Sequence, residues 1–254
     1  MMYSLEDLLH LMSRLRDPQY GCPWDIKQTY ATIVPHTLEE AYEVADAIEN
    51  GDLDALKDEL GDLLLQVVFH SQMASEIGQF DFNDVVSSIC EKMVRRHPHV
   101  FGEQDATPKS IPDSWESIKA TEREAGSDNS ALAGVARALP ALLRAQKIQK
   151  RAARTGFDWP DQSGARDKII EELEEVTTAT SAEHVAEEIG DLLFAVVNFA
   201  RFHEVDAETA LKAASAKFER RFRDMEVSAG DAFPALSLDE KELLWQQAKS
   251  KEAK

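Results

Sequence analysis

The chain has 254 residues, of which 43% are hydrophobic and 30% charged, so it can bury a core and is not of a disordered type. Its 47 acidic residues against 28 basic ones give a formal net charge of -19. That balance argues against binding to a nucleic-acid backbone, which needs a basic face. It suits either a protein that holds cations or one whose acidic surface aids solubility.

The first residues, MMYSLEDLLH, lack a basic region followed by an apolar one, so we expect no secretory signal. The longest strongly apolar run, residues 63–69, is too short to span a bilayer, so we expect no membrane partner. The two cysteines, Cys22 and Cys90, suggest neither a metal-type cluster nor a disulfide framework. We therefore expect a soluble cytoplasmic protein in a reducing compartment.

Helical periodicity dominates the chain, and strand-like alternation is hard to find, so the sequence predicts an all-α fold. A first helix is expected to start at the N-cap Thr37, with a glutamate three residues later in the capping-box spacing, and to end at Gly51. Asp52 or Asp54 should then cap a longer helix that reaches about Gly78. Because the joining turn is so short, the two helices should pack antiparallel.

The chain repeats itself after a break. The stretch EAGSDNSALAG is small, polar and free of aromatic residues, which predicts a linker at 126–133 between domains 1–125 and 134–254. Sequence blocks recur in the same order on both sides of it, among them DELGDLLLQVV with EEIGDLLFAVV and KMVRRHPHV with KFERRFRDM. The sequence therefore predicts two copies of one fold.

Each copy carries five acids, as Glu-Glu-x-x-Glu on the first helix of the pair and Glu-x-x-Asp on the second. Residues three apart share a helix face, so an antiparallel pair can aim four carboxylates at one another. The positions are Glu39, Glu40, Glu43, Glu59 and Asp62 in the first copy and Glu171, Glu172, Glu175, Glu188 and Asp191 in the second.

A solvated acidic face is the simplest alternative. Two features disfavour it: LEEAYEVADAIE contains no interleaved base, and Asp62 and Asp191 directly precede aliphatic runs. Carboxylates without His or Cys suit a hard cation, Mg²⁺ or Mn²⁺ as its substitute. Gly61 and Gly190 lie inside the acidic pattern, where each either leaves room for a metal-bound group or permits tight helix packing.

A Lys-x-x-Arg-Arg block follows each acidic region. Its repetition favours an anionic, phosphate-bearing ligand over surface ion pairing. The blocks are Lys92, Arg95 and Arg96, and Lys217, Arg220 and Arg221. Trp115 and Trp245 follow the blocks and serve either as core residues or as stacking surfaces for a base, whereas Trp24 and Trp159 are expected to be structural anchors. Glycine-rich phosphate loops and nucleophile motifs are absent from the sequence.

The segments GCPWDIKQTY, TLEEAYEV and DELGDLLLQVVFHSQMA resemble the MazG nucleoside triphosphate pyrophosphohydrolases, of the all-α NTP pyrophosphatase superfamily. The resemblance implies two tandem four-helix-bundle-like MazG domains in a homodimer. It also implies Mg²⁺-dependent hydrolysis of NTP or dNTP to the monophosphate and pyrophosphate, with broad base tolerance, as nucleotide-pool housekeeping.

The resemblance further implies that the C-terminal copy is the main catalytic one. Its expected nucleotide contacts are Lys168, Lys217, Arg220, Arg221 and Trp245. The first copy keeps the acids and the basic block but continues with HPHVFG where the second has FRDMEV, which leaves its activity open.

For the C-terminal copy we expect four Mg²⁺ ligands, a water-activating acid and three basic residues that hold the leaving pyrophosphate. Attack at the α-phosphorus is implied by the resemblance alone. The ligands are Glu172, Glu175, Glu188 and Asp191, the water-activating acid is Glu171, and the basic residues are Lys217, Arg220 and Arg221. One alternative is a regulatory module that binds Mg–NTP without turnover. A di-iron bundle is disfavoured because it calls for Glu-x-x-His, which neither copy offers.

Overall fold

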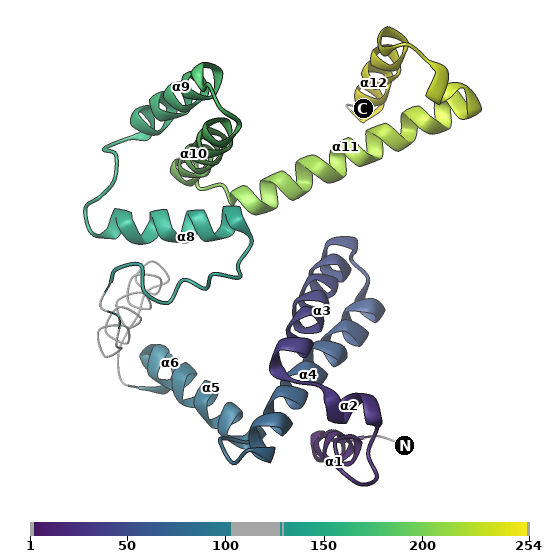
Figure 1. Cartoon of the computed structure of the whole chain (residues 1–254), viewed down its shortest axis with the longest axis vertical. Helices are drawn as coiled ribbons and strands as arrows, with labels where there is room; N and C mark the ends of the chain where they lie inside the picture. Colours follow the sequence, from purple (N-terminus) through teal and green to yellow (C-terminus); the bar gives the residue numbers. More distant parts are fainter. Residues whose placement is uncertain (1–2, 103–127, 129, 253–254) are drawn as a thin grey trace. The chain divides into compact units, whose positions relative to one another are not determined.

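A computed structural model describes residues 3–102, 128 and 130–252, and every regular element within them is a helix. The all-α prediction is thereby confirmed. The chain divides into two compact units, 1–118 and 119–254, each of which is described by itself (Figure 1). Of the predicted linker 126–133, residues 126, 127 and 129 lie outside the described residues, as does Trp115.

The N-terminal unit is organised around a long antiparallel helix pair, α3 and α4 (Figure 1). Helix α1 packs against α4. Its core is a cluster of buried apolar side chains where α1, α3 and α4 meet, comprising Met12, Ile33, Val68, Phe69 and Met73. The helices are α1 (Leu5–Leu15), α2 (Pro23–Lys27), α3 (Tyr30–Asn50), α4 (Leu53–Glu76), α5 (Phe82–Arg96) and α6 (Pro98–Phe101).

The predicted start of the first helix is wrong. Helix α3 begins two turns earlier, where the hydroxyl of Thr29 accepts a hydrogen bond from the Thr32 amide in a capping box. The early turns include Pro35, a residue type that normally disrupts a helix interior. Thr37 lies inside the helix and donates its hydroxyl to the carbonyl of Ile33.

The predicted turn between the two long helices is confirmed. Gly51 ends α3 in the left-handed region, at φ +69°, which glycine adopts without strain. Of the two proposed caps, Asp52 is the N-cap, and its carboxylate accepts from the amides of Asp54 and Ala55. The helix ends at Glu76, close to the predicted Gly78.

The C-terminal unit repeats this plan (Figure 1). Helices α9 and α10 form the antiparallel pair, α8 packs across α10, and α12 folds back against α11. The elements are α8 (Ala141–Arg154), α9 (Gln162–Thr178), α10 (Ala182–Phe202), α11 (Ala207–Ala229), the 3-10 helix η1 (Gly230–Ala235) and α12 (Leu238–Glu252). The copies therefore correspond as α1 to α8, α3 to α9, α4 to α10 and α5 to α11.

Each unit carries a Gly-x-x-Trp sequence after its first helix, at residues 21–24 and 156–159. In each unit an arginine–carboxylate pair ties the segment around this sequence to the second long helix. In the N-terminal unit Arg16 donates to both carboxylate oxygens of Glu76 at 2.7 Å. In the C-terminal unit Arg201 donates to both oxygens of Asp158, at 2.9 and 2.5 Å. In the N-terminal unit the second long helix carries the acid, whereas in the C-terminal unit it carries the arginine. The two copies therefore make the same connection with the two charges exchanged.

Both helix pairs leave the same apolar stripe exposed. In α4 it consists of Leu60, Leu64 and Val67, and in α10 of Ile189, Leu193 and Val196, each set spaced i, i+4, i+7. Aligning Glu59 with Glu188 brings the two stripes into register residue by residue. Within the described parts of the chain, no helix combines the length and the apolar character needed to cross a membrane.

Candidate functional site

Three of the predicted acids meet between α9 and α10. Glu172 and Glu188 are buried, with 4% and 9% of their surface exposed, whereas Asp191 is exposed. One carboxylate oxygen from each of these three residues lies within 4.8 Å of the other two. Glu172 lies on the side of α9 that faces α10. Glu188 and Asp191, three residues apart, share the side of α10 that faces α9. A solvated acidic face does not describe this arrangement.

Lys168 lies one turn before Glu172 on α9 and contacts both Glu172 and its neighbour Glu171. Its Nζ is 2.8 Å from Oε1 of Glu171 and 2.5 Å from Oε1 of Glu172. The hydrogen bonds to Glu171 and Glu172 raise the pKa of Lys168 above its ordinary value. The same hydrogen bond lowers the pKa of Glu172, so both partners are charged at neutral pH.

Glu175 completes the acidic group from one turn further along α9. Burial first, and then the neighbouring charge of Glu188, raise the pKa of Glu175 above its usual range. The pKa of Glu175 is therefore raised while that of Glu172 is lowered, because Lys168 forms a hydrogen bond with Glu172 and not with Glu175. The group is short of positive charge.

Sequence reasoning missed His184, which lies on α10 one turn before Glu188. Its Nε2 is 2.9 Å from Oε1 of Glu188. The i, i+4 spacing on one helix was the available signal. The carboxylates are therefore not free of histidine, because the imidazole of His184 lies within ion-pairing distance of Glu188.

The residues present fit a hard divalent cation. Oε2 of Glu172 is buried and has no hydrogen-bond partner in the described structure, although a buried carboxylate oxygen without a partner is costly. Several negative charges converge with one ammonium group among them, and the converging donors are carboxylate oxygens. Oxygen donors in this number are what Mg²⁺ and Mn²⁺ prefer.

The N-terminal copy assembles a similar but more open group. Carboxylate oxygens of Glu40, Glu43 and Glu59 lie within 4.8 Å of one another. Burial raises the pKa of Glu40, with further contributions from a hydrogen bond to Glu43 and from the charge of Asp62. In this copy, the fifth acid, Glu39, lies 3.6 Å from Nδ1 of His36.

The two copies differ in their basic neighbours. Aligning Glu39 with Glu171 places His36 where the C-terminal copy has Lys168. Aligning Glu59 with Glu188 places Ala55 where the C-terminal copy has His184. The acids are therefore duplicated, whereas the permanent cation beside them belongs to the C-terminal copy.

The structure separates the two explanations for Gly61 and Gly190. A methyl group added at either glycine would meet nothing within 4 Å. Close helix packing inside the described chain is therefore not the reason for glycine. The open space beside the backbone is compatible with the approach of a bound group.

The C-terminal basic block gathers with the predicted tryptophan between α11 and α12. Arg221 donates to Glu252 at 2.7 Å, and Arg220 contacts the same carboxylate at 3.4 Å. The Arg221 guanidinium lies 5.5 Å from the centre of the Trp245 ring. A cavity of about 310 Å³ adjoins both arginines. Lys217 precedes them by one turn on the same helix.

Within one chain the basic blocks lie apart from the acids. The acids are near the α9–α10 turn, whereas α11 starts beyond the other end of α10 and leads away from the pair (Figure 1). The N-terminal copy has the same geometry, because α5 leaves from the far end of α4 and carries Lys92, Arg95 and Arg96 in its last turns. The predicted site residues thus form an acidic group and a basic group in each copy.

Comparison with known proteins gives two matches to one family model, the MazG nucleotide pyrophosphohydrolase domain, at residues 28–101 and 162–225. These ranges contain both acidic groups and both basic blocks. The nucleoside triphosphate pyrophosphohydrolase of Escherichia coli K12 is 50% identical, with 99% of each chain covered.

Two further relatives match almost the whole chain. The nucleoside triphosphate pyrophosphohydrolase/pyrophosphatase MazG of Thermotoga maritima is 44% identical over 96% of this chain and 95% of its own. The uncharacterized protein YabN of Bacillus subtilis is 42% identical over 95% of this chain and 51% of its own length.

Proposed function

The chain belongs to the MazG nucleotide pyrophosphohydrolase family, and we propose that it hydrolyses nucleoside triphosphates, NTP or dNTP, to the monophosphate and pyrophosphate. The observation that carries this proposal is the buried carboxylate group of Glu172, Glu188 and Asp191 with its unpartnered Glu172 oxygen. A site of this kind needs a cation, and a cation bound there recruits a polyphosphate.

Glu172, Glu175, Glu188 and Asp191 would hold Mg²⁺ in this proposal, with Mn²⁺ as a substitute. When bound, the cation lowers the pKa of a coordinated water and offsets phosphate charge. Lys168 keeps Glu171 and Glu172 in fixed rotamers through its two short contacts, which pre-orients the acids before substrate arrives.

The chain's own groups then divide the chemistry. Glu171, at the exposed edge of the acids, orients or deprotonates the attacking water. Water attacks the α-phosphorus, and the bond from that phosphorus to the bridging oxygen breaks, which yields the two products. Lys217, Arg220 and Arg221 hold the charge that develops on the leaving pyrophosphate.

A homodimer is the proposed working form, and two observations support it. The exposed stripe Ile189, Leu193 and Val196 is the face that a second helix pair would cover to complete a four-helix bundle. Helix α11, which carries the basic block, also leads away from the acids of its own chain. The basic block of a second copy can therefore reach these acids. Sedimentation velocity tests this: Leu193→Lys should yield monomers, whereas Val227→Lys, at an exposed apolar residue on α11, should not.

The proposed partners are nucleotides, with no nucleic acid and no membrane. The net charge of -19 opposes binding to a phosphate backbone. A cytoplasmic setting is part of the proposal, since Cys22 and Cys90 are both free thiols, which that compartment keeps reduced. Broad base tolerance and a housekeeping role complete it.

A product assay tests the activity. The protein is incubated with Mg²⁺ and a panel of NTPs and dNTPs, and monophosphate and pyrophosphate are quantified. Asp191→Asn should abolish release, whereas Glu174→Gln, an exposed acid on α9 outside the group, should match wild type. Saturable NTP binding with intact NTP would contradict the proposal and favour a regulatory module that binds without turnover.

A further inference from the structure

The last helix, α12, folds back against α11 and meets its basic block with one face (Figure 1). Trp245, Ala248 and Glu252 lie on that face, because they follow one another at i, i+3 and i+7. Trp245 is held in place by Phe218 of α11, with the two ring centres 5.3 Å apart. Sequence reasoning assigned the tryptophan and the bases to nucleotide binding and gave Glu252 no role.

Two residues of α12 hold the guanidinium group of Arg221. Glu252 accepts a hydrogen bond from Nε of Arg221 at 2.7 Å. The guanidinium carbon lies 5.5 Å from the centre of the Trp245 ring, within the range of a cation–π contact. Only 17% of the Arg221 side chain is exposed. With one contact on its edge and one on its face, the guanidinium plane has a fixed orientation.

The outer end of Arg221 remains available to a ligand. Arginine carries five N–H donors, and Glu252 occupies the one at Nε. The Nη1 and Nη2 atoms of Arg221 donate no hydrogen bond to any residue that the structure describes. These two nitrogens form a fork that can bind two oxygens of one phosphate group. Arg221 is therefore oriented but not used up.

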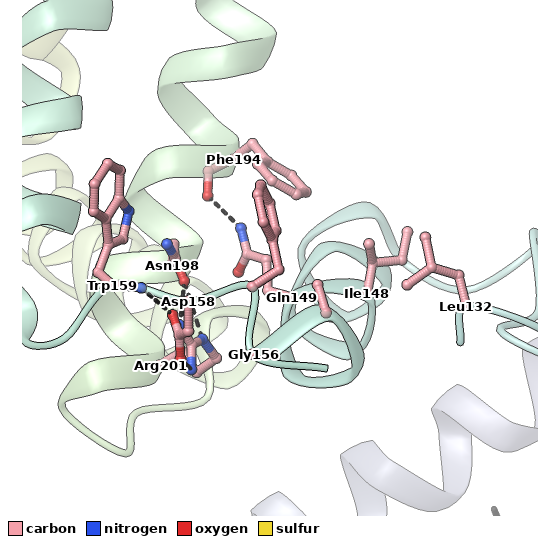
Figure 2. A pocket seen from close by; sticks show the side chains of 11 residues that line it. Leu132, Ile148, Gln149, Gly156, Asp158, Trp159, Phe194, Asn198 and Arg201 are labelled. Carbon is pink, nitrogen blue, oxygen red and sulfur yellow. Dashed lines mark hydrogen bonds and ion pairs between the residues drawn. The ribbon is translucent and has the colours of Figure 1, made fainter. Parts of the chain in front are cut away.

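Arg201 of the same unit shows the opposite arrangement. It lines a larger cavity, of about 490 Å³, between α8 and α10 (Figure 2). Its Nη1 and Nη2 donate to Asp158, and its Nε donates to Asn198 (Figure 2). All three nitrogens of Arg201 are thus engaged inside the unit. An arginine beside a cavity is therefore not by itself a phosphate site, and Arg221 differs by its unengaged fork.

The cavity next to Arg221 has a surplus of positive charge. Its volume is about 310 Å³, and three basic and two acidic residues line it together with an alanine: Arg220, Arg221, Lys251, Asp224, Glu252 and Ala248. Both acids are already paired, Asp224 with Lys251 at 2.8 Å and Glu252 with the arginines. An anion that enters the cavity therefore meets net positive charge.

Arg220 lacks the support that Arg221 has. Its Nη2 lies 3.4 Å from Glu252, and 64% of its side chain is exposed. A contact of that length is weak, so a ligand has to order the Arg220 side chain at a cost in rotamer entropy. The two neighbouring arginines, which the sequence assigned to one task, therefore have different local settings.

We propose that Glu252 is a positioning residue that acts through Arg221: it holds Nε so that Nη1 and Nη2 present a preformed fork to the pyrophosphate end of the nucleotide. This inference rests on the proposed function. An arginine that is already ordered loses less entropy when phosphate binds, so Glu252 adds to affinity without touching the substrate. The carboxylate also repels phosphate, and the proposal requires that orientation outweigh this repulsion.

Calorimetric titration of pyrophosphate into the full-length protein with Mg²⁺ measures the effect apart from turnover. Glu252→Ala removes the acceptor of Nε and should raise the Kd about 10- to 100-fold. Glu252→Gln keeps an oxygen that can accept from Nε, so its Kd should stay within about threefold of wild type. Glu219→Ala is the matched control, since it removes the partner of the exposed Arg223 on the same helix, and it should change nothing.

A double-mutant cycle tests whether Glu252 acts through Arg221. Lysine has no Nε–Nη fork, so in an Arg221→Lys background Glu252→Ala should change the Kd by less than about twofold. In an Arg220→Lys background Glu252→Ala should keep its full effect, because the contact with Arg220 is weak. Equal effects in the two backgrounds would overturn the assignment to Arg221.

A second control separates orientation from the docking of α12. Asp224→Asn breaks the pair with Lys251, which holds the same end of α12, without touching Arg221. This variant should not weaken pyrophosphate binding. A rise in Kd equal to that of Glu252→Ala would show that both acids act only by holding the helix, and it would overturn the positioning role.

The sign of the effect decides between orientation and competition. If Glu252→Ala and Glu252→Gln both tighten pyrophosphate binding, the carboxylate competes with phosphate for the arginines, and the proposal is overturned. An unchanged Kd in Glu252→Ala, or a wild type that does not bind pyrophosphate, also overturns it. If wild type binds pyrophosphate but releases no monophosphate from any NTP, the proposed function fails, and the titrations still decide the role of Glu252.

Discussion

Nζ of Lys168 lies 2.5 Å from Oε1 of Glu172, and the corresponding position of the N-terminal copy is occupied by His36, 3.6 Å from Glu39. The two copies thus share their acids but differ in the permanence of the cation beside them. We expect Lys168→His, which imports the N-terminal residue, to lower kcat/KM about 100-fold, the scale on which one electrostatic contact acts. His36→Lys is the reciprocal control and should leave it within about twofold. Comparable losses in both variants would contradict the assignment.

The C-terminal copy should carry most of the turnover. Glu172→Gln removes a buried ligand oxygen while keeping the side-chain shape, and pyrophosphate release should fall about 1,000-fold. Glu40→Gln makes the matching change in the N-terminal acids and should retain most of the activity. Steady-state pyrophosphate release measures both. A larger loss in Glu40→Gln would move the catalytic centre to the N-terminal copy.

The Arg16–Glu76 pair should make stability depend on pH. The hydrogen bonds from Arg16 lower the pKa of Glu76 in the folded state, and the Arg16 charge adds to the effect. The pair's contribution is therefore fully present above the unfolded pKa of about 4.3 and is lost as pH falls through the lower folded value. At pH 7, Glu76→Gln should reduce the unfolding free energy by about 1–2 kcal/mol.

Urea unfolding at pH 7 and near pH 3 measures this dependence. The difference between Glu76→Gln and wild type should shrink at the lower pH, because the ionised form of Glu76 that pairs with Arg16 is progressively lost. Glu91→Gln, at an exposed acid on α5, serves as the control and should show little difference at either pH. A constant difference across the range would show that the lost contact is not ionic.

The cap at Asp52 should matter more than the acid that follows it. Asp52→Ala leaves the amides of Asp54 and Ala55 without their acceptor, which should cost about 1 kcal/mol. Asp54→Ala removes a first-turn charge and an exposed ion pair with Lys57, and it should cost less, about 0.3–1 kcal/mol. Thermal unfolding followed by circular dichroism compares them. Equal shifts in Tm would contradict the assigned cap.

Gly190→Ala should make the protein more stable and less active. An added methyl group meets nothing within 4 Å, so the substitution should gain about 1 kcal/mol of helix stability. Activity should fall, because the methyl group occupies space that a bound group uses during turnover. Gly61→Ala should bring the same stability gain with little change in rate. Unchanged activity in Gly190→Ala would remove the functional reason for this glycine.

Spacing predicted the features that depend on a single helix or a short turn. The acidic pattern, the Gly51 turn and the Asp52 cap follow from local periodicity and capping chemistry. The structure forms the turn and the cap where the sequence places them, and it brings together three of the predicted acids in each copy. The predicted start of α3 is wrong because Thr37 and the glutamate three residues later match the capping-box spacing, whereas the cap that forms is Thr29, further upstream.

Features that depend on the tertiary arrangement of the helices could not be predicted from the sequence. Residue spacing does not encode the direction in which α11 leaves α10, so the separation of Arg220 and Arg221 from the acids could not be read from it. The orphaned oxygen of Gln149 is equally invisible, because it arises only when α8 crosses α10 and the amide nitrogen meets the carbonyl of Phe194.

The matching apolar stripes on α4 and α10 should also make the stability of the protein depend on its concentration. A chain that leaves leucine-rich helix faces uncovered gains stability by association, so its apparent melting temperature should rise as its concentration rises. In the proposed homodimer, newly synthesised copies without a partner would expose these apolar stripes and would be the ones that chaperones and proteases encounter first. A higher expression level should therefore lengthen the lifetime of the protein in the cell, because more copies have these apolar stripes on α4 and α10 covered.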